Sequence, residues 1–170
     1  LAKAKAGSDG HFIFSDEEES YKIALENTIN FVNHILKFKP DNLSFIIENL
    51  FPSPKKRHSL NCSYDEIAEL MNALPDEVGI LLDLGHLNIS SNILNFNRNK
   101  AIDKLLENFF DRIKEIHISE NNGLKDEHLA VKKNSWQLEV LKSIVTQDKK
   151  RDIIYCIEAR RASEEEMLNS

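Results

Sequence analysis

Residues 78–86 read Val-Gly-Ile-Leu-Leu-Asp-Leu-Gly-His, an apolar run that ends in a carboxylate and an imidazole. Because apolar side chains fill the run almost continuously, it is typical of a strand that is buried on both faces of a parallel sheet. Gly85 would allow a tight turn where the chain leaves this strand. The stretch therefore predicts a strand whose carboxyl end presents two polar side chains, Asp83 and His86.

Four other short apolar runs have the same character, and amphipathic segments with helical spacing separate them. Repeated strand–loop–helix units predict a parallel sheet with right-handed crossovers. S-x-x-E sequences satisfy free backbone donors at a helix N-terminus, so we expect helices to start at Ser15, Ser63 and Ser163. The prediction is an α/β fold with about five βα units. The expected strands are His11–Phe14, Leu43–Glu48, Val78–Asp83, Ile113–Ile118 and Ile153–Glu158, and the expected helices include Tyr21–Leu36, Ile67–Leu74, Ile102–Phe110 and Leu138–Val145.

Composition narrows the class of protein. The 170 residues suffice for one buried core, 29% of them are charged, and the net charge is −6. Such a balance argues against a general nucleic-acid binder or a membrane-surface binder, because both need a basic face. No apolar run approaches the roughly 18 residues of a membrane span, and no signal-peptide core opens the chain. Two widely separated cysteines, Cys62 and Cys156, predict free thiols and a cytoplasmic location.

Ligand-type residues stand at the carboxyl ends of four successive expected strands: Glu48, Asp83, His117 and Glu158. Their spacings are 35, 34 and 41 residues, about one βα unit each. In a parallel barrel these strand ends converge on one mouth. Three carboxylates and an imidazole meeting there would repel one another unless a cation neutralised them. An oxygen-rich set with one nitrogen predicts Mn²⁺, Mg²⁺ or Co²⁺, with Zn²⁺ an option where more histidines join.

A D-x-H sequence, Asp126-Glu-His128, follows the strand that contains His117. In an extended segment residues two apart point the same way, so Asp126 and His128 could both face the same mouth. Together with His86 they are candidate additional ligands.

These segments resemble the xylose-isomerase-like barrel superfamily, which includes sugar-phosphate isomerases and epimerases and the endonuclease IV type of abasic-site endonuclease. The resemblance implies a (β/α)8 TIM barrel. Because the chain begins with Leu1 rather than Met and ends inside an expected helix, we expect residues 1–170 to be the C-terminal part of a single such domain. The matching segments are Phe45-Ile-Ile-Glu-Asn49, Val78–His86, Ile113-Lys-Glu-Ile-His-Ile-Ser119, Asp126-Glu-His128 and Cys156-Ile-Glu158.

In the isomerase and epimerase branch, the resemblance implies that Glu48, Asp83, His117 and Glu158 bind the metal. It also implies that Glu48 and Glu158 move a proton through an enediolate, and that His86 contacts the sugar or sugar phosphate. This branch is the leading hypothesis for the function.

Two alternatives stay open. In the endonuclease branch His86, Asp126 and His128 would complete a zinc cluster acting on nucleic acid, with His11 as a further ligand. Asp126 and His128 favour this branch, whereas the acidic charge and the absence of the branch's glycine-rich segments favour the isomerase. The other alternative is an inactive barrel fragment, because about five strands cannot close a barrel. Their exposed edges would need to pair with a partner, for example within an oligomer.

Overall fold

A four-stranded parallel sheet organises the chain, whose structure, a computed structural model, describes residues 2–6, 8, 12–52, 59–147, 153–160 and 162–169. The strand order β3-β4-β5-β6 follows the sequence, so each strand lies beside the next one along the chain. The α/β prediction is confirmed, with four parallel strands in the described residues where about five were expected. The strands are β3 (Phe45–Glu48), β4 (Val78–Asp83), β5 (Ile113–Ile118) and β6 (Ile154–Ile157).

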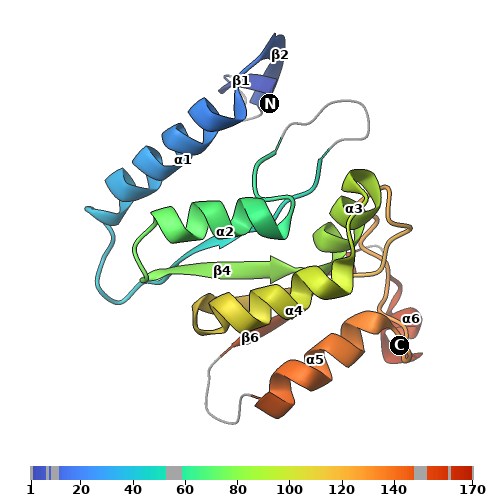
Figure 1. Cartoon of the computed structure of the whole chain (residues 1–170). Coiled ribbons are helices and arrows are strands. Elements are labelled where there is room, and N and C mark those ends of the chain that lie inside the picture. Colours follow the sequence, from blue (N-terminus) through green and yellow to red (C-terminus); the bar gives the residue numbers. More distant parts are fainter. Residues whose placement is uncertain are drawn as a thin grey trace.

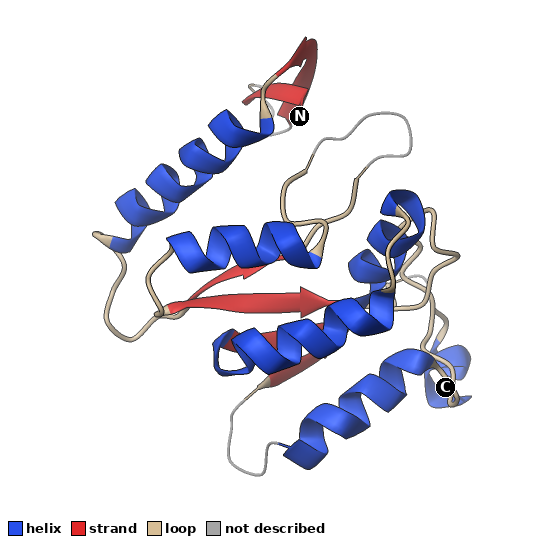
Figure 2. Ribbon diagram, in the orientation of Figure 1, coloured by secondary structure: helices blue, strands red, loops and turns tan. Residues whose placement is uncertain are grey.

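Helices connect these strands and cover one face of the sheet (Figure 1). One helix joins β3 to β4, two join β4 to β5, and one joins β5 to β6, as the alternation of helix and strand in Figure 2 shows. A further helix follows β6. The helices are α2 (Tyr64–Ala73), α3 (Leu84–Leu94), α4 (Arg98–Phe109), α5 (Trp136–Gln147) and α6 (Glu164–Asn169). No helix in the described ranges is long and apolar enough to cross a membrane.

An antiparallel hairpin precedes the sheet, formed by β1 (Ala2–Ala6) and β2 (Phe12–Glu18). The expectation that His11–Phe14 begins the parallel succession is therefore wrong. Pairing between these neighbouring segments closes only a short loop, which costs less chain entropy than pairing across a helical crossover. His11, the candidate extra ligand, lies outside the described residues.

Serine side chains cap the start of several of the described helices. The helix start predicted at Ser15 is wrong, because that residue lies inside β2; α1 (Tyr21–Leu36) begins instead after Ser20, whose hydroxyl accepts the Ile23 N–H. The starts predicted at Ser63 and Ser163 are confirmed. Their hydroxyls accept the N–H three residues later, at 3.4 Å and 3.2 Å.

The core lies between the sheet and the helices that cover it. Leu82 on β4 and Ile116 on β5 are fully buried, as are Leu70 on α2 and Leu105 on α4. The opposite face of β5 carries Glu115 and His117, which are only partly buried. The alternation along β5 thus separates an apolar face, which packs under the helices, from a polar face that is turned away from them.

Arg112 connects α2, β4 and β5 at the end of the sheet where these strands begin. It closes the short 3-10 helix Phe110–Arg112 that leads into β5. Its guanidinium donates three hydrogen bonds to backbone carbonyls, to Met71 at 2.6 Å, Val78 at 2.9 Å and Pro75 at 2.9 Å. These carbonyls lie in the last turn of α2, at the first residue of β4 and in the turn between them. The guanidinium of Arg112 therefore fixes where β4 and β5 begin.

We expect Arg112→Ala to lower the free energy of unfolding by roughly 2–4 kcal/mol, because it leaves three carbonyls without their charged donor. Arg112→Lys should recover only part of this loss, because an ammonium group cannot present the same fork of donors. Chemical denaturation measures both changes. Metal affinity should stay unchanged, since Arg112 lies at the far end of the strands; a selective loss of metal binding would contradict this structural role.

Candidate metal centre

Strand register brings the polar strand ends to one edge of the sheet. Glu48 ends β3 and Asp83 ends β4, where Asp83 is paired with His117 of β5. Glu158 directly follows β6, and its N–H donates to the Ile118 carbonyl at 3.0 Å. The four residues predicted as metal ligands therefore lie on four adjacent strands at the same end of the sheet.

Asp83, His117 and Glu158 form one potential ligand group, with one ligand atom of each lying within 4.8 Å of the others. The His117 Nδ1 atom lies 3.6 Å from a Glu158 oxygen and 4.0 Å from an Asp83 oxygen. This nitrogen is buried and has no hydrogen-bond partner within the part of the chain that is described. A buried nitrogen that faces two carboxylates without a hydrogen bond is well suited to a cation.

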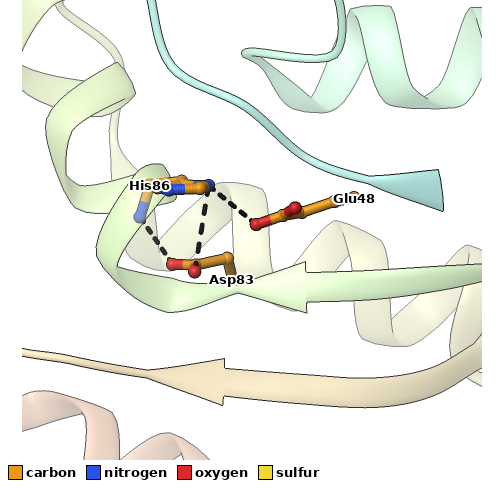
Figure 3. Close-up of side chains that lie close together, drawn as sticks. All are labelled: Glu48, Asp83 and His86. Carbon is orange, nitrogen blue, oxygen red and sulfur yellow. Dashed lines mark hydrogen bonds and ion pairs between the residues drawn. The ribbon is translucent and has the colours of Figure 1, made fainter. Parts of the chain in front are cut away.

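His86 forms a second group with Glu48 and Asp83, whose side chains converge in Figure 3. Its Nδ1 lies 2.9 Å from the Asn49 carbonyl and 3.2 Å from a Glu48 oxygen. A backbone carbonyl can only accept, so this nitrogen carries a proton and is not free to bind a metal. Burial disfavours the charged ring, but the interactions with Glu48 and Asp83 outweigh it and raise the pKa of His86 to about 9.

Asp83 belongs to both groups and also starts a helix. One of its oxygens accepts the His86 N–H at 2.7 Å, which makes Asp83 the N-cap of α3. The chain therefore enters a helix at once, and the tight exit turn expected after Asp83 is wrong. The carboxyl group is 1% exposed, and this burial raises its pKa. Its other oxygen faces His117 and remains available to a metal.

Gly85 is needed for close packing rather than for a turn. It lies inside α3, where an added Cβ would stand 2.7 Å from the Ser119 hydroxyl and 3.2 Å from an Asp83 oxygen. Any larger residue would push against the carboxylate at the centre of the site.

Asp126 and His128 reach the same edge of the sheet from the loop after β5. A short antiparallel bridge between Glu120 and Leu129 folds this loop back. The Asp126 carboxylate lies 2.7 Å from His128 Nε2 and 3.6 Å from His86 Nε2. His128 Nδ1 in turn lies 3.0 Å from the Glu158 carbonyl, so both of its ring nitrogens face acceptors.

The sequence interpretation missed three contributors: Asn49, Glu115 and Arg160. Asn49 is 2% exposed and exchanges two hydrogen bonds with the Asp83 backbone, at 2.7 Å and 3.0 Å. Glu115 lies 2.8 Å from His117 Nε2. Arg160 donates to a Glu158 oxygen at 2.7 Å. The position of Asn49 directly after Glu48 was a usable signal, whereas the other two look like surface charges in sequence.

Arg160 keeps Glu158 ionised. Burial opposes ionisation, but the hydrogen bond from Arg160 and the nearby His117 lower the pKa of Glu158 below its ordinary value. We expect Arg160→Ala to move this pKa upward in the metal-free protein, as measured by carbon-13 titration of the carboxyl group. Arg160→Lys retains the charge and should move it less. An unchanged pKa in Arg160→Ala would show that Arg160 does not control this carboxylate.

Comparison with known proteins identifies the fold to which this site belongs. Residues 6–169 match the family described as "Xylose isomerase-like TIM barrel". The chain belongs to this family. This member of the xylose isomerase-like family also superimposes on a D-tagatose 3-epimerase-like protein with a TM-score of 0.64 at 24% identity. A Rhodospirillum rubrum protein provisionally named a xylose isomerase gives a TM-score of 0.56 at 20% identity. At these identities the two structures show the fold.

These matches cover 85% and 87% of the present chain but 50% of either neighbour. The chain thus spans half the length of the xylose isomerase-like structures that it matches, and its four parallel strands correspond to half of a TIM barrel. No curated protein matches it in sequence.

The donors of this xylose isomerase-like site fit a divalent cation. Three carboxylates and one imidazole are an oxygen-rich set of the kind that Mg²⁺, Mn²⁺ and Co²⁺ accept. The unpartnered His117 Nδ1 is the structural observation that supports this fit.

Proposed function

We propose that this chain carries the metal-binding half of a barrel that isomerises or epimerises a sugar or sugar phosphate. The observation that carries the proposal is the convergence of Asp83, His117 and Glu158 around an unpartnered imidazole nitrogen. Membership of the xylose isomerase-like family supports the fold, and the resemblance of the strand ends suggests that residues 1–170 supply the C-terminal part of the domain.

In this proposal two glutamates move a proton between opposite faces of a substrate. Glu48 ends β3 and Glu158 follows β6, and these are the two outer strands of the sheet. Asp83 and His117 lie between them on the central strands. A substrate held over the centre would thus meet one carboxylate on either side. One glutamate can remove the proton and the other can return it, which carboxylates do within hydrogen-bond reach.

The remaining polar groups have supporting roles in this proposal. Asp83, His117, Glu48 and Glu158 would hold the cation. When bound, a divalent cation there polarises a substrate carbonyl and stabilises negative charge that develops on its oxygen. The Nδ1 atom of His86 is occupied by the Asn49 carbonyl, so a substrate hydroxyl would bind at Nε2, which lies 3.6 Å from an Asp126 oxygen. We place this reaction in the cytoplasm, because Cys62 and Cys156, both among the described residues, form no disulfide.

Deuterium exchange tests the function across many candidate substrates at once. The chain is incubated in D2O with Mn²⁺ and a panel of aldoses, ketoses and their phosphates, and incorporation at the carbon beside the carbonyl is followed by NMR. We expect incorporation for one substrate class and its loss after chelation. Absence of exchange across the panel, with Mn²⁺ binding verified by calorimetry, would refute the proposal.

A zinc phosphodiesterase acting on abasic sites in nucleic acid is the second candidate. The position of Asp126 between His86 and His128 favours it, as does a buried Asp126 oxygen without a partner in the described residues. The engagement of both His128 nitrogens counts against it. Metal analysis distinguishes the two: about three zinc ions per chain and cleavage of an abasic oligonucleotide would support the phosphodiesterase. A chain that binds no metal would instead support an inactive fragment.

A further inference from the structure

We propose that Glu115 is a positioning residue that fixes the tautomer of His117 and makes Nδ1 the nitrogen presented to the metal. This inference rests on the metal-dependent function proposed above. Glu115 lies two residues before His117 on β5, so both side chains point to the same face of the sheet. Its Oε1 atom lies 2.8 Å from His117 Nε2. The carboxylate is 21% exposed and the imidazole 13%, so the pair is largely shielded from water.

The position of the proton follows from the chemistry of the pair. An ionised carboxylate can only accept a hydrogen bond, so His117 Nε2 must donate and carry the proton. In a neutral imidazole the other nitrogen then has a free lone pair. Glu115 therefore determines that Nδ1, and not Nε2, is the ligand atom of His117.

The surroundings of Nδ1 agree with this assignment. Carboxylate oxygens of Asp83 and Glu158 lie 4.0 Å and 3.6 Å from it, and it makes no hydrogen bond within the described ranges. The other two imidazoles of the site differ, because Nδ1 of His86 and Nδ1 of His128 both contact backbone carbonyls. Of these three rings, His117 is the one whose Nδ1 is left without a hydrogen-bond partner.

A carboxylate behind a metal-binding histidine also affects affinity. It orients the ring, holds the required tautomer and makes the ligand nitrogen more basic, and losing such a partner usually weakens metal binding about 10–100-fold. Without Glu115 the proton could move to Nδ1, where an N–H would point at the centre and exclude the cation. Glu115 therefore prepares the metal site without touching the metal.

Nitrogen NMR tests the tautomer directly. The metal-free chain is labelled with 15N-histidine, and His117 is observed by long-range 1H–15N correlation at a pH at which its own titration shows the ring to be neutral. The native chain should show a protonated Nε2 and an unprotonated Nδ1. In Glu115→Gln the amide can donate as well as accept, so we expect a mixture of tautomers. Glu115→Leu removes the partner altogether and should give a larger change.

Calorimetry with Mn²⁺ supplies the second measurement. Its dissociation constant should rise about 10–100-fold in Glu115→Gln. The control is Glu139→Gln on α5, which removes an exposed carboxylate paired with Lys142 and should change neither the tautomer nor the affinity. If Glu115→Leu fails to fold, the isosteric Glu115→Gln variant still tests whether Glu115 controls the tautomer of His117.

The two proposals fail in different ways. If both Glu115 variants keep the native tautomer of His117, the role of Glu115 is refuted, whatever the chain does with substrates. If the tautomer shifts but neither the native chain nor any variant binds Mn²⁺, the function proposed above is refuted. The control of His117 by Glu115 then still stands.

Discussion

Replacing Glu158 by glutamine is expected to reduce proton exchange on the substrate by about 10²–10⁴-fold, the usual contribution of a positioned acid or base. Glutamine has nearly the same shape and keeps an oxygen that can accept from Arg160, so the fold should survive. It cannot, however, accept a proton at the pH of the reaction. The measurement is deuterium incorporation beside the carbonyl of whichever substrate the exchange panel identifies.

Controls separate loss of the base from loss of the metal. Mn²⁺ affinity is measured for Glu158→Gln, and exchange is compared at saturating metal. Glu139→Gln, an exposed change on α5, should exchange like the native chain. Glu48→Gln should also lose exchange, because the proposal needs a carboxylate on each side of the substrate. Unchanged exchange in Glu158→Gln at saturating metal would remove Glu158 from the proton-transfer role.

Asp83→Asn is expected to have opposite effects with and without metal. Asp83 belongs to both potential ligand groups and is 1% exposed. Removing one partner from a buried charge interaction costs about 3–5 kcal/mol, so Mn²⁺ affinity should fall by at least about 10²-fold. In the metal-free protein the same change should stabilise the fold, because asparagine can still cap α3 and has no buried charge. Thermal melts with Mn²⁺ and with a chelator measure the two effects.

The pH dependence of stability independently tests whether Asp83→Asn stabilises the metal-free protein. Burial raises the pKa of Asp83 above its value in the unfolded chain. The unfolded state therefore loses its proton first as pH rises, and stability falls until the folded group has ionised as well. The advantage of Asp83→Asn should appear above the ordinary aspartate pKa and be absent in more acidic solution. Asp103→Asn on the exposed side of α4 is the control. An Asp83→Asn variant that melts below the native chain at neutral pH without metal would contradict this account.

The parallel sheet could be predicted because its signals are local and consistent. The bounds predicted for β4 and β5 agree with the structure, and β4 has the apolar residues at nearly every position that are typical of a buried parallel strand. The helix starts at Ser63 and Ser163 followed from capping chemistry. At Ser15 the same pattern misled, because pairing between β1 and β2 outweighed a local helix signal. A local helix signal determines the structure only where no competing strand partner is near.

The convergence of the candidate ligands could be predicted, but their hydrogen bonds could not. One βα unit between ligand-type residues implied that Glu48, Asp83, His117 and Glu158 would lie at one edge, and the structure places them there. Which nitrogen of each histidine faces a carbonyl depends on strand register and ring orientation. Neither can be inferred from the spacing of these residues in the sequence. Arg160 and Glu115 were missed because a charged residue without a recognised motif is most often solvated.

Asp83 also limits which amino acids its position can tolerate. The cap of α3 needs a short acceptor that reaches back to the His86 N–H, which aspartate and asparagine supply but the longer glutamate does not. The proposed cation needs a negative charge, which asparagine lacks. Aspartate alone meets both demands. In any related protein, asparagine at this position would therefore mark a barrel that had kept its architecture after giving up its metal.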